Sequence, residues 1–600
     1  MNLLKASKGK VVITPPAGTP MAGNIRSDNK SRGVHDDLFC SIIILKDDNK
    51  KICFLGFDLI GLEYSTCNEI RTRISECTDI PSSNVMIWAT HTHSGPDTGM
   101  RMYQGNENAV ASYLGGLVEK VAEKVKDLNN FEEVRLKAGK ILIPDLSFNR
   151  RLVKNNGSVV MNFESFSPEQ ITGTTGPVDQ ELIALSLWDN AGRLYAILVN
   201  FSLHPAILVG QEWLISRDFI HYLDKTLIEN YGKDVVMLYA NGAEGNINHL
   251  NYHDRDQMRN FAEAERVGKK LGDYVEKAIR TSVALHGKIK YAFSKASIPF
   301  RSITKEEIEW ARMVIERDRN ISEDMFDGIP DKTYARMILE MTEREETECD
   351  IFLQGMAIHN FAIVTFPGEV YAEFGLKVKE LSPYTYTMII GLANGQAGYI
   401  PDSKAFEQGG YEIRTAWTSQ LAKDAGEMLV SLVGTRIIDN LNGQSVRTME
   451  RQASDNKYLH RDFHAALNMM LNYILDNFGE EALKEYLEQY SGAFHKPLNN
   501  RLKSGDKELL ADYFREKYRN EEWPVRITAS ETAVVIEQEA CPGIAAILAR
   551  GEKPCRLYVE TYASVYRTLC EGTPFEYSLD YFDNDTGACR QRFTYNGGRI

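Results

Sequence analysis

Two kinds of apolar segment are missing from the 600-residue sequence. No apolar run reaches the roughly 18 residues that a membrane-spanning helix needs, so no membrane span is expected. The N-terminal stretch MNLLKASKGKVVITPP lacks the apolar core of a signal peptide. Together, these absences predict a protein that stays in the cytoplasm.

Cysteine is scarce as well, with nine residues in the whole chain. An odd number of cysteines, spread without clusters, does not suggest a disulfide framework and fits the reduced thiols of a cytosolic protein. The four C-terminal cysteines lack the CxxC spacing of a zinc knuckle; they are Cys541, Cys555, Cys570 and Cys589. We expect buried, inert thiols there, with a reactive thiol among the first three as the alternative.

The charge balance excludes one class of partner. The chain carries 69 basic and 83 acidic residues, a net charge of −14. Nucleic acids and anionic membrane surfaces are polyanions, so neither is expected to bind such a protein in general. With 43% hydrophobic and 25% charged residues, the composition is that of a globular protein, and the length suggests two or three domains.

The pattern of apolar residues divides the chain into two parts. Up to about residue 440, short runs rich in β-branched residues alternate with helical stretches, which predicts an α/β domain over 1–440 with a largely buried sheet. The expected helices are Tyr64–Glu76, Ala109–Leu128, Asp218–Tyr231 and Asp256–Arg280, followed by a charged helical insertion over Lys305–Asp350. A polar linker is predicted at 441–455 and a smaller α+β domain at 456–600.

The stretch ATHTHSGPD (89–97) follows an apolar run that ends at Trp88. In an extended chain, side chains two positions apart point to the same side, so His91 and His93 are expected to face one space. Two such imidazoles can hold a metal, or one can hold it while the other contacts substrate. Alone, the pair is better explained by two hydrogen-bonded histidines near the surface.

Other polar residues recur at the ends of predicted strands, where sites assemble in α/β sheets. They are His204 in SLHP, Glu369 in FPGE, Tyr399 in NGQAGYIP and the loop ANGAEGNINH (240–249). Each alone has a structural explanation, such as a carboxylate at the positive end of a helix dipole or a glycine turn. Together with the two histidines, they offer the nitrogen, carboxylate and phenol ligands of a zinc site.

Six segments decide between these alternatives, because in order and wording they resemble the neutral/alkaline non-lysosomal ceramidase family over about residues 8–440. The segments are ITPPAGTPMAG, GVHDDLFC, ATHTHSGPD, VNFSLHP, FPGE and NGQAGYIP. The resemblance implies a ceramidase-like α/β catalytic domain with a mixed sheet and a zinc-dependent amidohydrolase site. It implies four zinc ligands: His91, His204, Glu369 and Tyr399. It also implies three residues that position the substrate: His93, Arg150 and Tyr411.

The match departs from the family in the loop Gly245–His249. Ceramidases carry a serine there, in a GDVSP-type sequence, whereas this chain has Asn246 and Asn248 in place of the aspartate and the serine. An asparagine cannot be a hydroxyl nucleophile, but water activated by zinc does not need one. Asn248 could donate a hydrogen bond to a developing oxyanion, or form an Asx turn that caps the loop.

The C-terminal region also departs from the family, since the family's immunoglobulin-like domain is not found there. The region resembles an L-2-amino-thiazoline-4-carboxylic acid hydrolase-like domain. His460 and His464 lie one helical turn apart and could share a metal, but no third ligand is evident, so helix packing is expected. This domain is expected to shape the pocket, add a second activity or mediate assembly into a homo-oligomer.

We therefore expect a zinc-dependent hydrolase of an amide or cyclic C–N bond in a small cytosolic metabolite, not in ceramide. Arg150 suits a carboxylate-bearing substrate, because its planar guanidinium binds a carboxylate through two hydrogen bonds. One alternative is the same zinc site working in the condensing direction to form a lactam, cyclic imine or amidine. Another is a catalytically silent binding or scaffold protein, which the missing serine favours and the retained ligands disfavour.

Overall fold

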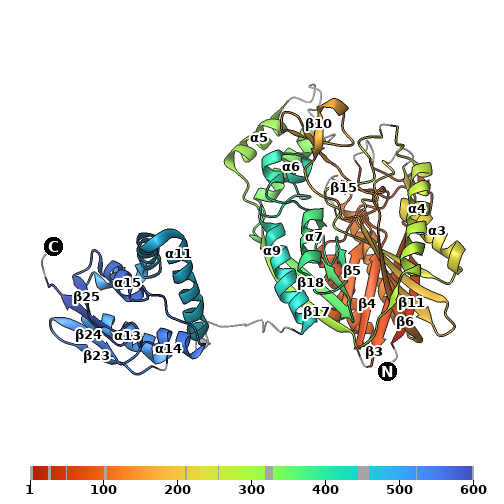
Figure 1. The fold of residues 1–600 in the computed structure, drawn as a ribbon. Coiled ribbons are helices and arrows are strands. Elements are labelled where there is room, and N and C mark those ends of the chain that lie inside the picture. The colour runs from red at the N-terminus through yellow and green to blue at the C-terminus, as the bar shows by residue number, and fades with distance from the viewer. Residues whose placement is uncertain are drawn as a thin grey trace. The chain divides into compact units, whose positions relative to one another are not determined.

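The computed structural model describes residues 4–24, 29–48, 50–99, 105–209, 213–254, 256–317, 329–443, 459–521 and 523–597. The chain forms two compact units, Met1–Thr448 and Met449–Ile600 (Figure 1). The last helix of the first unit, α10, ends at Asn442. Most of the linker predicted at 441–455 therefore lies outside the described residues.

The first unit is built on a large mixed sheet with the strand order β14-β12-β11-β6-β1-β3-β4-β5, and β16 also pairs with β6. In that order, the strands are Val236–Asn241, Leu194–Phe201, Glu181–Asp189, Glu132–Leu142, Lys5–Val12, Phe39–Asp47, Lys50–Phe57 and Val85–Ala89, and β16 is Val283–Ala284. Two neighbouring pairs are parallel, β4 with β5 and β12 with β14, and the other pairs are antiparallel. The expected mixed, largely buried sheet is therefore confirmed.

A second sheet faces the first. Its order is β17 (Lys290–Pro299), β18 (Glu348–Ile358), β19 (Phe361–Thr365) and β21 (Tyr386–Ile390). Apolar side chains of both sheets, such as Leu198 and Met388, belong to one buried cluster, so the sheets share a core. Two packed sheets bury their inner faces together, which is why so many strand residues here are apolar.

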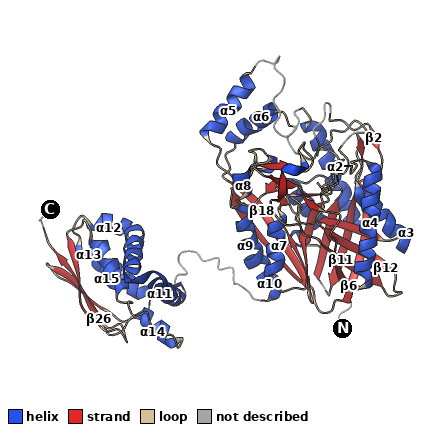
Figure 2. Cartoon of the chain, turned by 45° about the horizontal axis from the view of Figure 1, so that its top comes forward, coloured by secondary structure: helices blue, strands red, loops and turns tan. Residues whose placement is uncertain are grey.

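Helices cover the outer faces of both sheets (Figures 1 and 2). The first sheet is covered by α1 (Tyr64–Cys77), α2 (Glu107–Asp127), α3 (Phe219–Tyr231) and α4 (Phe261–Arg280). The second is covered by α7 (Ala372–Leu381) and by the helical segment α9 (Ala425–Leu432), η4 (Val433–Ile438) and α10 (Asp439–Asn442). The unit is thus a four-layer sandwich of helices, two sheets and helices.

Helix α4 shows how the sequence sets an element's bounds. The helix begins at Phe261, later than the predicted Asp256, because the side chain of Asn260 accepts a hydrogen bond from the backbone N–H of Glu263 and caps it. Its buried residues recur every three or four positions up to Ile279. Gly268 allows close packing on α3, because a Cβ atom there would lie 2.4 Å from the carbonyl oxygen of Phe219.

The charged insertion predicted over Lys305–Asp350 is helical only in part. It contains α5 (Lys305–Glu316), which begins with a capping box at Thr304, and α6 (Asp331–Thr342). Its last residues instead start strand β18, since Glu348 pairs with Pro299 of β17. Pairing with a distant strand outweighs the local helical preference of this acidic stretch.

Short elements complete the first unit and border the site. They are β2 (Gly33–Val34), η1 (Ser82–Asn84), β7 (Phe148–Asn149), β8 (Arg151–Lys154), β9 (Val159–Met161), η2 (Pro168–Gln170), β10 (Ile171–Thr174), β13 (Leu214–Ile215), β15 (Ile247–Asn248), β20 (Glu369–Val370), β22 (Tyr399–Ile400), α8 (Ala405–Gln408) and η3 (Tyr411–Ile413).

The second unit has the α+β character predicted for it. Its sheet is antiparallel in the order β23 (Arg526–Ala529), β24 (Ala533–Gln538), β26 (Cys589–Tyr595) and β25 (Phe575–Phe582). Its helices are α11 (Leu459–Phe494), α12 (Lys496–Leu502), α13 (Lys507–Asn520), α14 (Pro542–Ala549) and α15 (Glu560–Cys570), and α11 is broken at Gly479, where φ is +88°. In the part of the chain that the structure describes, no helix is long and apolar enough to cross a membrane.

Candidate metal centre

The two histidines of ATHTHSGPD lie just beyond β5, which ends at Ala89. His91 has a φ of +73°, a strained conformation for a residue with a side chain. Its backbone N–H donates to the carbonyl of Leu59, which holds the turn in place. His91 and His93 do face one space, as expected, but a turn brings them there rather than the alternation of an extended strand.

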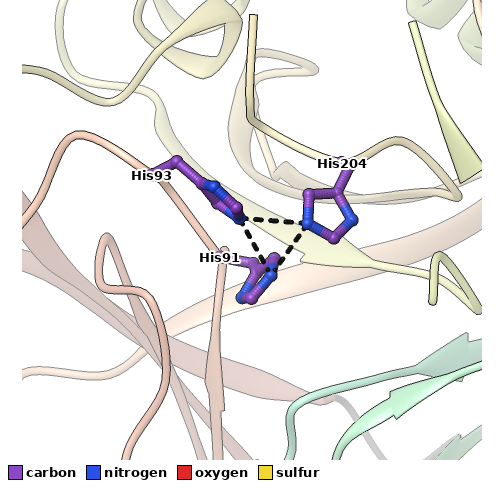
Figure 3. Close-up of side chains that lie close together, drawn as sticks. All are labelled: His91, His93 and His204. Atoms are coloured by element: carbon purple, nitrogen blue, oxygen red, sulfur yellow. Dashed lines mark hydrogen bonds between the residues drawn. The ribbon is translucent and has the colours of Figure 1, made fainter. Parts of the chain in front are cut away.

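Three imidazoles converge on one point (Figure 3). The Nε2 atom of His204 lies 3.0 Å from the Nε2 atoms of both His91 and His93, and those two are 3.3 Å apart. Nitrogen ligands on a tetrahedral zinc ion at 2.0–2.1 Å would be about 3.3 Å apart. The spacing of the imidazoles is therefore close to that of a zinc site.

The other ring nitrogens of two of these imidazoles explain which atoms face the centre. The Nδ1 atom of His91 lies 2.6 Å from the carbonyl oxygen of Ile60, and that of His204 lies 3.5 Å from the carbonyl oxygen of Glu244. If each Nδ1 carries the proton and donates it to the carbonyl, each Nε2 presents a lone pair. Burial, and then the neighbouring His91, hold the pKa of His204 well below its usual range, which keeps that imidazole neutral.

Glu369 adds a carboxylate to the histidines. Its Oε2 atom lies 3.3 Å from Nε2 of His91 and 3.8 Å from Nε2 of His204. Yet this oxygen accepts no hydrogen bond from any described residue, although Glu369 is buried. A buried carboxylate oxygen that faces two lone pairs without a donor fits a cation between them.

Tyr399 reaches the same place through a short parallel pairing. Strands β20 and β22 pair in the register Glu369 with Tyr399, so the two residues are direct neighbours. The hydroxyl group of Tyr399 lies 3.4 Å from that of Tyr411, at the start of η3. Burial raises the pKa of both phenols, so both are protonated at neutral pH in the absence of a metal.

Glu244 is a site residue that was not predicted from the sequence. Each of His91, His204, Glu244 and Glu369 offers a ligand atom, and these atoms lie within 4.8 Å of one another. Both carboxylate oxygens of Glu244 are buried and have no partner among the described residues. Burial, and then the carboxylate of Glu369, raise its pKa well above the usual range. The available signal was its position in the loop ANGAEGNINH after β14, a loop in which only Asn246 and Asn248 were considered.

The first unit matches proteins of known family and structure. A sequence model described as neutral/alkaline non-lysosomal ceramidase, N-terminal, matches residues 7–241. This part of the chain is similar to that ceramidase family. The predicted resemblance ran further, to about residue 440; the matched residues lie within the first unit, Met1–Thr448, here called the ceramidase-like unit.

Two solved structures have the fold of this ceramidase-like unit. A neutral ceramidase from Pseudomonas aeruginosa has a TM-score of 0.57 and 16% identity, over 74% of this chain and 75% of that one. A structure described as ceramidase complexed with C2 has a TM-score of 0.58 and 16% identity, over 74% of this chain and 76% of that one. Family and fold together indicate a hydrolase that cleaves an amide bond.

Arg150 is held beside the two phenols of the ceramidase-like unit. Its guanidinium carbon lies 5.1 Å from the ring centre of Tyr411 and 5.4 Å from that of Tyr399. Its Nε donates to Glu412 (3.1 Å) and one Nη donates to the carbonyl of Gly245 (2.6 Å). Because these two nitrogens are engaged, the remaining Nη is left for a substrate. Arg150 is therefore less able to bind a carboxylate through the two hydrogen bonds expected from the sequence.

Asn248 is tied into an amide pair. Its Nδ2 donates to Oδ1 of Asn162 (2.7 Å), and its Oδ1 accepts from Nδ2 of Asn162 (2.8 Å). The same Oδ1 accepts the backbone N–H of Leu250 at 3.0 Å, the pattern of an Asx turn. One amide hydrogen of Asn248 remains for other partners.

Asn246, which stands in place of the family's aspartate, connects the loop to helix α7. Its Oδ1 accepts the backbone N–H of Ala372, the first residue of that helix, and its Nδ2 donates to Glu373 at 2.9 Å. An aspartate at this position would bring a second carboxylate against Glu373. The asparagine thus suits its surroundings.

All eight residues predicted to form the site line one cavity of about 350 Å³. This volume lies near the lower end of the range for small-molecule sites. The cavity is also lined by His249 and Arg259, from the loop after β15 and the residues before α4. The ceramidase-like unit therefore brings all the predicted residues together.

The histidines and cysteines named from the sequence of the second unit form no metal cluster among the described residues. The side chain of His460 lies outside the described residues, whereas Nε2 of His464 lies 3.4 Å from Oε2 of Glu521. The four C-terminal cysteines are all buried, and burial raises the pKa of each thiol. The resemblance of this unit to an amino-thiazoline-carboxylate hydrolase stays a prediction.

Proposed function

We propose that the protein is a zinc-dependent hydrolase of an amide or cyclic C–N bond in a small cytosolic metabolite rather than in ceramide. The observation that carries the proposal is the convergence of three imidazole Nε2 atoms, two of which also lie within 4 Å of a carboxylate oxygen that lacks a donor. Such a set has the donor types and the spacing that zinc prefers.

The zinc ligands in this proposal are His91, His204, Glu369 and Tyr399. Bound zinc would polarise the scissile carbonyl and lower the pKa of a water molecule toward neutrality. His93 and Glu244 lie close enough to join the ligand set, which would distinguish this site from the four-ligand pattern of the resemblance. The hydrogen bond from His91 to Ile60 fixes the ring orientation that the set requires.

The remaining residues would act on the substrate through hydrogen bonds. The protonated phenol of Tyr411 can donate to a carbonyl oxygen in the cavity, and the free Nη of Arg150 can stabilise negative charge that develops there. His93 would orient the scissile group. Each of these side chains is already held by a neighbour, so little reorganisation is needed at the moment of reaction.

Two observations support a substrate other than ceramide. The family's serine is replaced by Asn248, which has no hydroxyl group and whose amide pairs with Asn162. The cavity that the described residues enclose is small, about 350 Å³, whereas ceramide carries long alkyl chains. The cytosolic location in the proposal rests on the cysteine usage.

The proposal is tested by metal analysis combined with a substrate screen. The purified full chain is expected to carry about one Zn²⁺, and His204→Ala or Glu369→Ala should lower that content at least tenfold at equal free zinc. His286→Ala is the matched control, because this histidine of the first unit is exposed and distant in sequence from the residues that line the cavity. Full zinc occupancy in His204→Ala would show that the ligand assignment is wrong.

The screen compares short N-acyl amino acids, lactams and long-chain ceramide, followed by mass spectrometry of the products. Hydrolysis of a small amide that depends on zinc, with little release of fatty acid from ceramide, is the expected result. Rapid turnover of ceramide would overturn the substrate assignment. Formation of a cyclic product with release of water would favour the condensing direction, and no turnover with tight zinc would favour a binding protein.

A further inference from the structure

We propose that His249 and Arg259 form a subsite for a carboxylate group of the substrate, in the wall of the cavity that contains the metal centre. The inference rests on the proposed function, because it names the class of amide that the site would accept. Neither residue belongs to the predicted zinc site or to the groups placed beside the scissile bond.

His249 is the observation that points to a ligand. The residue is only 1% exposed and lines the cavity. Neither of its ring nitrogens has a hydrogen-bond partner among the residues that the structure describes. Buried polar groups in folded proteins are nearly always paired, so a buried imidazole with two unpaired nitrogens at a cavity wall indicates a partner that arrives from the cavity.

The backbone around His249 is fixed on both sides. Asn248 is held by Asn162, and the carbonyl of Leu250 accepts a hydrogen bond from the same Asn162 side chain at 2.7 Å. The carbonyl of His249 itself accepts from Nε2 of Gln257 at 2.9 Å. This network places the imidazole before any ligand binds, which lowers the entropy that binding must overcome.

Arg259 supplies the positive charge. It lines the same cavity and is close enough to His249 to lower the pKa of that imidazole, after the larger effect of burial. Because the pKa of His249 is about 3, the ring is neutral at physiological pH and offers one N–H donor. A carboxylate between the two residues would accept hydrogen bonds from both, one of them charged.

The acidic neighbour of His249 is already neutralised. Glu263 is the carboxylate that acts on this imidazole, but Arg266 donates to both of its oxygens and Gln257 to one of them. A substrate anion would therefore meet Arg259 without strong competition from Glu263.

The arrangement defines a substrate with two recognition points. Its amide or cyclic C–N group would lie at the metal centre, and a carboxylate on the same molecule would lie at His249 and Arg259. N-acyl amino acids and carboxylated lactams have this form. An amide substrate without a carboxylate would leave the imidazole of His249 without a hydrogen-bond partner.

The test uses calorimetric titration of the metal-loaded full chain with hydroxamates, which bind zinc through one end. Acetohydroxamate reports the metal centre alone. The monohydroxamates of succinate, glutarate and adipate add a carboxylate at increasing distance, and the methyl ester of each is the neutral control. At least one acid is expected to bind about tenfold more tightly than its ester, the gain typical of a charged hydrogen bond.

Variants then locate the preference. His249→Ala and Arg259→Gln should bring the acid-to-ester ratio of affinities close to one, while the affinity for acetohydroxamate, the zinc content and the melting temperature change little. Arg259→Lys keeps the charge and should retain part of the ratio. Arg280→Gln is the matched control, since it removes an exposed arginine at the end of α4 that does not line the cavity, and it should keep the full ratio.

Equal affinity of every acid and its ester in the native protein would overturn the subsite. So would an acid preference that survives both His249→Ala and Arg259→Gln, because the carboxylate would then bind elsewhere. If His249→Ala does not fold, the acid-to-ester ratios of Arg259→Gln and Arg259→Lys test the subsite instead. If acetohydroxamate fails to bind, the proposed metal function is wrong, and titration of glutarate against dimethyl glutarate then judges the subsite by the same ratio.

Discussion

Replacing Asn248 by alanine tests whether this residue supports the loop or contacts the substrate. The substitution removes the two hydrogen bonds to Asn162 and the one from the N–H of Leu250. The Nδ2 group of Asn162 keeps its bond to the Leu250 carbonyl. Two groups in a buried region lose a partner: the Oδ1 atom of Asn162 and the N–H of Leu250.

The expected cost follows from these two groups. A buried polar group left without a partner costs about 1–3 kcal/mol. Asn248 is 6% exposed, so water can replace little of what is lost. Asn248→Ala should therefore lower the free energy of unfolding of the first unit by about 2–6 kcal/mol. Activity should fall far less than the 10²–10³-fold that loss of an oxyanion donor typically causes.

Urea unfolding followed by tryptophan fluorescence measures this effect on the full chain. The signal reports mainly on the first unit, because one of the six tryptophans, Trp523, lies in the second unit. A double-mutant cycle with Asn162→Ala should give a coupling energy of about 1–2 kcal/mol. An Asn248→Ala protein of unchanged stability that has lost at least about 100-fold in kcat would refute the reasoning and place this residue on the substrate.

Three further substitutions or modifications follow from the structure. Gly23→Ala should weaken zinc binding at least tenfold in a chelator competition, because φ is +94° and a Cβ atom would lie 2.6 Å from Cα of His93; unchanged affinity would contradict this packing. Asn246→Asp should destabilise the first unit at pH 8 by placing a second carboxylate against Glu373, and the loss should shrink toward pH 4 as a carboxyl group takes up a proton; equal urea midpoints for variant and native protein at both pH values would disprove it. Cys541 should resist iodoacetamide in the folded protein and react in urea, since burial raises its pKa, and rapid labelling without urea, detected by mass spectrometry, would show an accessible thiolate.

Local sequence patterns predict much of the secondary structure. The expected helix Tyr64–Glu76 is α1, Tyr64–Cys77, and Asp218–Tyr231 is α3, Phe219–Tyr231, with Asp218 as its N-cap. Apolar spacing and capping act between residues a few positions apart, so they can be read from the chain alone. The first residues of β18, Glu348–Asp350, were assigned to the helical insertion because their partner strand, β17, is about fifty residues away in sequence.

The sequence alone also pointed to the types of ligand and, through the ceramidase resemblance, to their positions. Only the tertiary structure brings them together: His91 and His204 are separated by 113 residues, and Glu369 meets Tyr399 through the pairing of β20 with β22. The loop after β14 was singled out but Glu244 within it was not, and the Asn162–Asn248 amide pair and the unpaired imidazole of His249 could not be foreseen. Their roles depend on which polar atoms are buried and which of those find a partner, and that is settled when distant segments pack together.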